Sequence, residues 1–444
     1  MTLQYPRPAS GLIVAAPSSG AGKTTVATAL MAALTRHGLR VAPAKVGPDY
    51  IDPRFHEAAT GRSSMNLDGW AMRPDCLDGL IAARGTDADL VVAEGVMGLF
   101  DGAPMAGAVD DGSTAALARR TGWPVLLVLD AARQAGSVAA LVHGFRSFDP
   151  AVPVAGVILN RIGSGRHANL LRRALAPLGL PVVGAIPRDA ATDRPSRHLG
   201  LVQAGEDPAL ADWLDRIATL AETHVDLDGV RALARPSRIG GAPAASLPPL
   251  GNRIAVARDE AFAFLYPHLL DGWRTEGAEL TFFSPLADEA PDPAADAVYL
   301  PGGYPELHAG RLADAERFRA DLHTAADRGA WIYGECGGFM ALGDALVDAD
   351  GASHRMAGLL PLTTRFDVRR LHLGYRLITT SVETPFGPTG VRLRGHEFHY
   401  STVGAEGGAD RLFEVEDASG TRLGAQGLRR GRVIGSYMHL IDRD

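Results

Sequence analysis

Apolar runs of strand length recur along the first half of the chain and alternate with longer segments of helical character. The runs are continuous rather than alternating in polarity, which is typical of parallel strands buried on both faces. They cover residues 11–16, 90–93, 125–129 and 154–159, and helix-like segments cover residues 23–36 and 113–120. This alternation predicts a doubly wound α/β domain.

A second series of apolar runs begins after residue 250, at residues 254–257, 280–283, 297–300 and 331–333. Between the two series, residues 235–250 are rich in Gly and Pro and follow neither the strand nor the helix period, which is typical of a linker. We therefore expect an N-terminal domain at residues 1–234, a linker at residues 235–250 and a second α/β domain at residues 251–444.

Composition narrows the class of protein. A length of 444 residues allows two domains with cores of their own, and a net charge of −7 disfavours a nucleic-acid partner. Cys76 and Cys336 are the two cysteines, so a disulfide framework is implausible and a reduced compartment is expected. The N-terminus has no signal-peptide pattern, and no run of 18 or more apolar residues occurs. We expect a cytoplasmic protein with no membrane partner.

The first candidate site is a phosphate-binding loop. Residues 17–25 read Pro-Ser-Ser-Gly-Ala-Gly-Lys-Thr-Thr and stand between a predicted strand and a predicted helix, as such a loop requires, although Pro17 replaces the usual first glycine. Backbone N–H groups and the helix N-terminus attract phosphate, Lys23 would reach the β- and γ-phosphates, and the Thr24 hydroxyl would hold Mg²⁺. The residues expected to bind ATP are Ser19, Gly20, Ala21, Gly22, Lys23, Thr24 and Thr25.

Two acidic segments follow at the ends of predicted strands. One includes Asp49 and Asp52, and the other begins at Glu94 and reaches Asp101. Ligands of open α/β sheets bind at the carboxyl ends of strands, where carboxylates can complete a Mg²⁺ shell or orient a nucleophile. The alternative is that Asp49 and Asp52 cap turns and Glu94 caps a helix. Beside a phosphate loop, a metal or substrate role is favoured.

The second candidate site is centred on Cys336, in the sequence Gly-Glu-Cys-Gly-Gly between an apolar run and the start of a helix. Flanking glycines tolerate the strained turn of a nucleophile elbow, and a helix N-terminus favours thiolate. His439 is the candidate base, and the glycine turn that contains Gly303 is the type of loop that forms an oxyanion hole. A lone cysteine is more often a small buried apolar residue, as we expect for Cys76. The glycine frame favours a nucleophile at Cys336.

The segment Gly-His-Glu-Phe-His-Tyr-Ser at residues 395–401 invites a metal interpretation. Its histidines lack the H-E-x-x-H spacing, and on a strand His396 and His399 would point to opposite faces. We predict a structural or substrate-facing segment rather than a zinc site.

Taken together, these motifs resemble the cobyrinic acid and hydrogenobyrinic acid a,c-diamide synthases of cobalamin biosynthesis, over nearly the whole chain. The motifs of that family stand in order at residues 17–25, 45–53, 55–56, 66–68, 94–102, 301–306, 334–338 and 395–401. The N-terminal half is similar to the dethiobiotin synthetase-like, amide-forming P-loop ATPases. The C-terminal half is similar to a class I glutamine amidotransferase of the cobyric-acid type, with a flavodoxin-like fold.

The resemblance implies a ligase that amidates the a and c acetate side chains of a corrinoid acid, using ATP and L-glutamine. Cys336 would form the glutamyl thioester, His439 would raise its nucleophilicity, and Gly303 would belong to the oxyanion hole. Ammonia would move internally to the N-terminal domain and displace phosphate from an acyl phosphate. Ile441 stands two residues past His439, where many class I relatives carry Glu, so the resemblance implies a Cys–His dyad.

The resemblance also assigns the remaining site residues. The residues expected to hold Mg²⁺ are Thr24, Asp49 and Glu94, and those expected near the substrate are Tyr50, Asp52 and Asp101. A homodimer is one open expectation for the oligomeric state.

Three alternatives stay open at this point. Cobyric acid synthase amidates other side chains of the same ring with the same two-domain plan, and a nickel-sirohydrochlorin a,c-diamide synthase acts on a different tetrapyrrole. A partitioning-type ATPase, a binding switch, would have no use for the Cys336 elbow. The sequence leaves open whether the ring carries cobalt, and we lean slightly to the metal-free acid.

Overall fold

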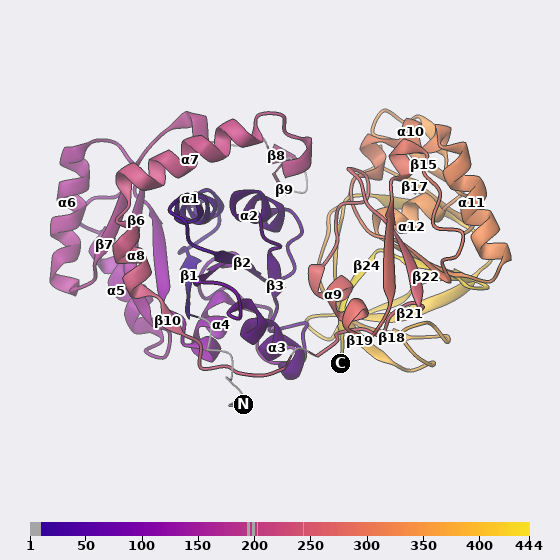
Figure 1. Ribbon diagram of the computed structural model, residues 1–444, viewed down its shortest axis with the longest axis horizontal. Coiled ribbons are helices and arrows are strands. Elements are labelled where there is room, and N and C mark those ends of the chain that lie inside the picture. Colours follow the sequence, from indigo (N-terminus) through magenta and orange to yellow (C-terminus); the bar gives the residue numbers. More distant parts are fainter. Residues whose placement is uncertain (1–9, 193–195, 198–199, 202, 243) are drawn as a thin grey trace. The chain divides into compact units, whose positions relative to one another are not determined.

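The computed structural model describes residues 10–192, 196–197, 200–201, 203–242 and 244–444. The chain divides into two compact units (Figure 1). The N-terminal unit comprises Met1–Trp70 and Pro74–Ala244, and the C-terminal unit comprises Ala71–Arg73 and Ala245–Asp444. Across the described parts of the chain, every helix is too short or too polar to cross a bilayer.

The N-terminal unit is built on one parallel sheet. In spatial order its strands are β3 (Met65–Leu67), β2 (Val41–Val46), β4 (Leu90–Glu94), β1 (Ser10–Ala15), β5 (Val125–Asp130), β6 (Val154–Ile162) and β7 (Val182–Pro187). Within the segment expected as a linker, β10 (Arg235–Pro236) pairs antiparallel with β1. The strand order reverses direction at β1, so ligands are expected to bind at its carboxyl end.

Helices cover both faces of this sheet, which confirms the doubly wound prediction (Figure 1). On one side lie α1 (Lys23–Arg36), α2 (Asp52–Thr60) and α7 (Leu210–His224), and on the other lie α3 (Pro74–Arg84) and α4 (Thr114–Thr121). The unit also contains α5 (Val138–Phe148), α6 (Gly165–Leu175), α8 (Leu227–Leu233) and the two-stranded ribbon of β8 (Ser196–Arg197) and β9 (Gly200–Leu201). Leucine and valine side chains of β1, β4 and α1 form one buried core cluster, which fixes the start of α1 at the end of β1.

The C-terminal unit contains a sheet of ten strands that is parallel in its first half only. The parallel strands are β12 (Glu279–Phe283), β11 (Arg253–Ala257), β13 (Ala297–Leu300), β14 (Trp331–Glu335) and β23 (Val433–Ser436). The antiparallel continuation is β22 (Arg422–Arg430), β21 (Asp410–Asp417), β18 (His372–Thr380), β19 (Arg392–His399) and β24 (Met438–Arg443). The apolar runs predicted β11, β12, β13 and β14, whereas β23 and the antiparallel strands were not predicted.

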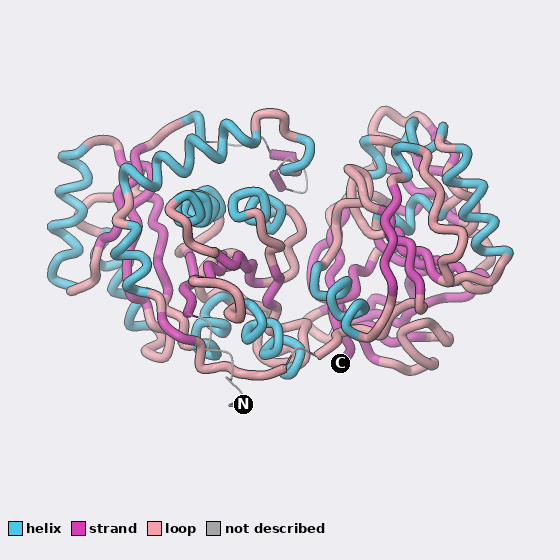
Figure 2. Tube along the Cα trace, in the orientation of Figure 1, coloured by secondary structure: helices cyan, strands magenta, loops and turns pink. Residues whose placement is uncertain are grey.

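Helices and a smaller sheet complete this unit (Figure 2). The smaller sheet consists of β16 (Ser353–Arg355), β15 (Ala345–Val347), β17 (Leu362–Arg365) and β20 (Thr402–Glu406). The helices are α9 (Pro267–Thr275), α10 (Ala309–Asp314), α11 (Glu316–Asp327) and α12 (Gly337–Leu342). Although β24 lies far from β14 in the strand order, the backbone N–H of Leu440 donates to the Glu335 carboxylate at 3.0 Å. The large sheet therefore curls until β24 meets the end of β14.

Candidate active sites

The phosphate loop connects β1 to α1, as predicted. Gly22, at the start of α1, has a left-handed backbone (φ 83°), and a Cβ atom there would lie 2.3 Å from the Asn160 side-chain nitrogen. That nitrogen donates to the carbonyl of Ala21 at 3.0 Å. Asn160, near the end of β6, therefore fixes the position of the loop, and only glycine fits at position 22.

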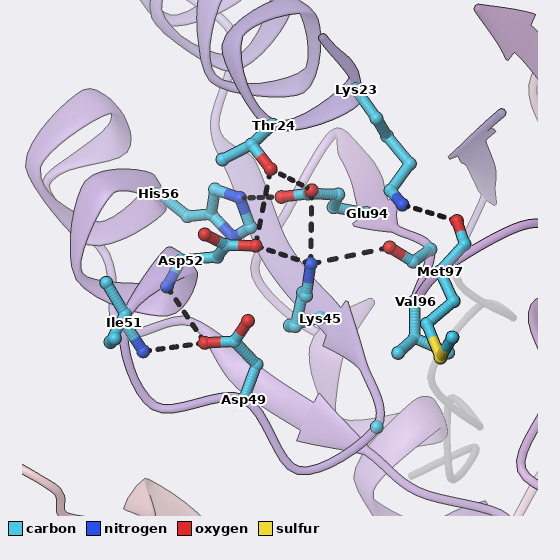
Figure 3. A network of polar contacts seen from close by, with 12 residues as sticks. Lys23, Thr24, Lys45, Asp49, Ile51, Asp52, His56, Glu94, Val96 and Met97 are labelled. Carbon is cyan, nitrogen blue, oxygen red and sulfur yellow. Dashed lines mark hydrogen bonds and ion pairs between the residues drawn. The ribbon is translucent and has the colours of Figure 1, made fainter. Parts of the chain in front are cut away.

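Lys23 and Thr24 point away from the loop into a polar network (Figure 3). The Lys23 ammonium donates to the carbonyl of Met97 at 2.8 Å, and the Thr24 hydroxyl donates to Glu94 Oε1 at 2.6 Å. Burial and the neighbouring Lys45 ammonium lower the pKa of Lys23. Lys23 and Thr24 thus connect the start of α1 to the segment that begins at Glu94.

Lys45 forms the centre of this network. Its ammonium lies 2.6 Å from Asp52 Oδ2 and 3.1 Å from Glu94 Oε1, and all three side chains are buried or nearly so (Figure 3). Burial opposes a charge on Lys45, but the two carboxylates outweigh it and raise its pKa. Burial and Asp49 raise the pKa of Asp52 to about 7.

Glu94 stays ionised for a different reason. Burial disfavours its charge, but Lys45 and a hydrogen bond from His56 outweigh burial and lower the pKa of Glu94. His56 Nε2 lies 2.7 Å from Glu94 Oε2, and its Nδ1 lies 3.3 Å from the Ser64 hydroxyl. Because an ionised carboxylate only accepts, the Nε2 atom of His56 carries a proton and donates it to Glu94. Lys45 and His56 were given no role from the sequence.

The structure brings Thr24, Asp52 and Glu94 together and uses Asp49 differently. Asp49 Oδ1 accepts from the backbone N–H groups of Ile51 (2.7 Å) and Asp52 (3.1 Å) at the start of α2. This is the turn-capping role that the sequence left as an alternative for Asp49.

The other two residues expected near the substrate lie in neighbouring loops. Asp101 Oδ2 accepts from the backbone N–H of Gly98 at 2.8 Å and closes the loop after β4, and the Tyr50 side chain is 5% exposed. Both lie in segments that border the network, and neither contacts Thr24 through a described hydrogen bond.

Thr24, Asp52 and Glu94 suit a magnesium ion in the nature of their donor atoms. One hydroxyl and two carboxylates are hard oxygen ligands, and Mg²⁺ is commonly held in proteins by one or two carboxylates together with phosphate oxygens and water. Thr24 Oγ1 lies 2.6 Å from Glu94 Oε1 and 3.3 Å from Asp52 Oδ2, so the three groups already converge. The donor set fits the ion, with Asp52 in the place expected for Asp49.

A cavity of about 280 Å³ adjoins the phosphate loop on the side of β6 and β7. Gly22, Thr25, Asn160 and Arg188 are among its lining residues. The neighbouring Arg161 has a left-handed backbone (φ 60°), and its guanidinium donates to the carbonyl of Gly20 at 2.8 Å. The position of Asn160 directly after the apolar run 154–159 was the sequence signal for this cavity, and it was missed.

Cys336 occupies a strained turn between β14 and α12. Its backbone angles are φ 46° and ψ −101°, a region that non-glycine residues rarely adopt. A Cβ atom on Gly338 would lie 1.9 Å from the carbonyl oxygen of Leu300, so the turn packs against β13 without room for a side chain. This is the nucleophile elbow that the glycine frame predicted.

The glycine turn after β13 meets both the elbow and the candidate base. A Cβ atom on Gly337 would lie 3.0 Å from the backbone nitrogen of Gly303, and one on Gly302 would lie 2.3 Å from His439 Cε1. His439 is buried on β24. Three segments that are far apart in sequence therefore supply a nucleophile, backbone N–H donors and an imidazole at one place.

Electrostatics correct one expectation at Cys336. Burial, reinforced by the charge of Glu306, raises the pKa of the thiol, although the backbone N–H of Gly337 opposes the shift. Burial lowers the pKa of His439. Burial outweighs the short helix α12 and favours the neutral forms of both the thiol and the imidazole.

The segment 395–401 forms part of β19, and its histidines point to opposite faces as predicted. Atoms of His372, Glu397 and His399 that could bind a metal lie within 4.8 Å of one another. However, the His372 and His399 rings are parallel within 6°, so their in-plane lone pairs do not converge on one point. Arg376 also contacts Glu397 Oε2 at 2.7 Å. The geometry favours an ion-pair network over a metal site.

This network borders a cavity of about 480 Å³ whose lining includes Arg370, Arg376, Glu397 and Tyr437. The carbonyl of Phe398, on the same strand as Glu397, lies 4.0 Å from Cys336 Sγ. A charged cavity therefore lies beside the nucleophile.

Comparison with known families agrees with both sites. Residues 12–202 match the family model of the CobQ/CobB/MinD/ParA nucleotide binding domain, and residues 253–443 match that of the CobB/CobQ-like glutamine amidotransferase domain. The fold and the two sites define an amide-forming enzyme in which a glutamine amidotransferase domain is joined to a nucleotide-binding domain. A partitioning-type ATPase switch is excluded, because such a switch has no use for a glutamine amidotransferase domain.

Relatives that match along nearly the whole chain define the family. A hydrogenobyrinate a,c-diamide synthase of Brucella abortus biovar 1 (strain 9-941) is 56% identical over 439 residues, which cover 97% of this chain and 98% of the relative. One of Rhizobium meliloti (strain 1021) is 56% identical over 434 residues, which cover 98% of this chain and 99% of the relative. A solved glutamine amidotransferase of Thermotoga maritima aligns with 42% of this chain and 75% of its own, at 18% identity and a TM-score of 0.30. The chain belongs to the hydrogenobyrinate a,c-diamide synthase family, which confirms the resemblance.

Proposed function

We propose that this protein converts the a and c acetate side chains of hydrogenobyrinic acid to amides, using ATP and nitrogen from L-glutamine. The observation that carries the proposal is the presence of both sites in one chain. A phosphate loop is tied to buried carboxylates, and a cysteine elbow and a buried imidazole both adjoin the glycine turn that contains Gly303. The relatives support the ring acid, because their names specify hydrogenobyrinate.

In the N-terminal unit a side-chain carboxylate of the ring acid attacks the γ-phosphorus of ATP. The bond from that phosphorus to the β,γ-bridging oxygen breaks, and ADP and an acyl phosphate form. Free carboxylate reacts poorly with amines because its charge repels nucleophiles and its oxygen leaves badly, whereas phosphate is a good leaving group. Lys23 neutralises charge that develops on the transferred group. Lys23 must exchange its bond to the Met97 carbonyl for the phosphate oxygens.

Mg²⁺ would be held by Thr24, Asp52 and Glu94 and, when bound, would neutralise negative charge on the phosphates. Lys45 holds the Asp52 and Glu94 carboxylates in place through contacts of 2.6 and 3.1 Å. Asp49 acts indirectly, because it accepts from the backbone N–H groups of Ile51 and Asp52 and so fixes the turn that positions Asp52.

In the C-terminal unit Cys336 gives its proton to His439, and its sulfur attacks the side-chain carbonyl of glutamine. The backbone N–H of Gly303 stabilises the oxyanion. As the tetrahedral intermediate collapses, His439 returns the proton to the leaving nitrogen, and ammonia departs from a glutamyl thioester. Water then hydrolyses the thioester to glutamate and the free thiol.

Ammonia released in this way displaces phosphate from the acyl phosphate and gives the amide. Transfer away from water would prevent both hydrolysis of the acyl phosphate and protonation of ammonia. We also propose a cytoplasmic location, because Cys76 and Cys336 are both free thiols in the described structure. A homodimer stays a prediction.

The experiment is turnover of the purified protein with ATP, Mg²⁺ and glutamine, with hydrogenobyrinic and cobyrinic acids tested side by side. Mass spectrometry should show a product in which two carboxylates have become amides. The kcat/KM should be higher for the metal-free acid than for the cobalt-containing acid. Preference for cobyrinic acid would move the proposal to the cobalt-containing ring, and amidation at other side chains would favour cobyric acid synthase.

A further inference from the structure

Glu335 stands directly before the nucleophile and reaches the imidazole. It is the last residue of β14 and is buried, and its Oε2 lies 3.8 Å from Nδ1 of the equally buried His439. At that distance the contact is between charges or dipoles rather than a hydrogen bond. One residue pair, Glu335 and Cys336, therefore presents a carboxylate and a thiol to the same site from a single turn.

The Glu335 carboxylate is held by three donors. Oε2 accepts from the Tyr299 hydroxyl (2.7 Å), and Oε1 accepts from the Tyr333 hydroxyl (2.6 Å) and from the backbone N–H of Leu440 (3.0 Å). Burial and Glu335 itself raise the pKa of both tyrosines far above 10, so they remain donors at any working pH. The two phenol rings are stacked within 10°, which fixes the direction of both hydroxyls.

The segment after His439 supplies no acid to this site. Ile441 is apolar, and its carbonyl oxygen lies 3.0 Å from His268 Nε2. The Asp442 carboxylate accepts from the Arg73 backbone N–H at 2.8 Å and from its guanidinium at 3.1 Å. A carboxylate beside a catalytic imidazole orients the ring and stabilises the imidazolium that forms when the ring takes a proton.

We propose that Glu335 is the positioning residue of the glutaminase site, orienting His439 and stabilising its protonated form in place of an acid on the C-terminal strand. This role rests on the proposed glutaminase function of Cys336 and His439. The three donors keep the carboxylate aimed at Nδ1, so that Nε2 is left to face the reacting atoms. The imidazolium that forms when Cys336 loses its proton then lies beside an ionised carboxylate.

Other titratable groups also face His439. His396 and His399 disfavour a positive charge there, and Glu397 favours it. Glu397, however, is engaged by Arg376 at 2.7 Å and His399 at 2.9 Å, so most of its charge is already balanced. No arginine or lysine contacts Glu335 among the described ion pairs. The charge of Glu397 is therefore balanced by neighbouring groups, whereas the charge of an ionised Glu335 is not balanced by a described ion pair with arginine or lysine.

Glu335→Gln tests this role, with glutamate release measured separately from ammonium-driven amidation. The neutral variant should lower kcat for glutamate release about 10²- to 10⁴-fold, as expected for loss of the acid of a triad, with KM for glutamine within about threefold. Ammonium-driven amidation should be unchanged. Glu335→Asp keeps the charge one methylene further away and should recover part of the rate. Glu279→Gln, at an exposed glutamate of the same unit, is the matched control.

The pH profile separates positioning from a purely structural role. Burial raises the pKa of Glu335 to about 7, so wild-type glutamate release should fall as the pH drops through about 7 and the carboxylate becomes protonated. That limb should be missing in Glu335→Gln. Because the Tyr299 hydroxyl lowers the pKa of Glu335, Tyr299→Phe should move the limb to higher pH.

Two results would overturn the assignment: glutamate release by Glu335→Gln within about threefold of wild type, or an acidic limb at the same pH in that variant. Loss of glutamate release with an unmoved profile and a lower melting temperature would show a structural role only. Glutamate release is measured without the ring acid, so it tests Glu335 separately from the proposed function. The role of Glu335 can be refuted while amidation of the ring acid is confirmed, and amidation can be refuted while the role of Glu335 is confirmed.

Discussion

Replacing Lys45 with Met tests the network that holds the proposed metal ligands. The methionine keeps an apolar stem of similar length but removes the charge that lies 2.6 Å from Asp52 and 3.1 Å from Glu94. Both carboxylates stay in a site from which water is largely excluded. At a pH well above 7, at which the variant is measured, both carboxylates are ionised, and the variant leaves two negative charges close together with no cation between them.

The expected cost follows from the burial of the partners. Lys45 is 3% exposed and Glu94 is fully buried. Removing one partner of a buried ion pair costs about 3–5 kcal/mol, because the other charge is left uncompensated. A domain of about 150–250 residues loses roughly 2–4 °C per kcal/mol, so the transition of the N-terminal unit should fall by roughly 10 °C.

Scanning calorimetry of the full chain measures this shift, with the transition of the C-terminal unit as an internal reference. The double variant Lys45→Met/Asp52→Asn removes one uncompensated charge and should regain at least half of the loss. Arg40→Met, which breaks an exposed pair with Asp89, is the matched control and should change little. A fall of less than about 2 °C, or no recovery in the double variant, would refute the reasoning.

Three further predictions concern the two sites. The pKa of Asp52 is raised to about 7, and only the ionised carboxylate binds a cation. The affinity for Mg²⁺ in the presence of ATP should therefore fall up to tenfold for each pH unit below 7. Calorimetric titration should find that the Asp52→Asn variant lacks this pH dependence. Gly303→Ala places a methyl group 2.1 Å from the Ala261 carbonyl oxygen. Steady-state kinetics should show that the rate of glutamate release falls about 10²- to 10³-fold. Ammonium-driven amidation should persist in this variant. Lys23→Ala should spare glutamate release and stop amidation; retained ATP-driven product would count against the phosphate-loop assignment.

The parallel strands and the first helix could be predicted because their signals are local. The apolar runs are continuous and three to six residues long, and α1 coincides with the predicted segment 23–36. The antiparallel strands gave no comparable signal. β22 is exposed along half its length and β21 has a mixed pattern of burial, so neither contains a long apolar run.

At the sites, the sequence identified the reacting groups but not how they are supported. Asp49 and Asp52 are three residues apart in one motif, and only the turn before α2 decides that Asp49 accepts from backbone N–H groups while Asp52 faces Thr24. The role of Glu335 could not be predicted from the sequence for a similar reason. Its partner Tyr299 lies on the neighbouring strand β13, and Leu440 and His439 lie on β24, which reaches Glu335 because the large sheet curls.

The most direct test of the account is amidation of hydrogenobyrinic acid by Cys336→Ala with either glutamine or a high concentration of ammonium as the nitrogen source. The account predicts no product with glutamine and near wild-type product with ammonium, because the sulfur site supplies only nitrogen. Loss of both activities in a folded variant, or full activity with glutamine, would contradict the division of labour between the two sites.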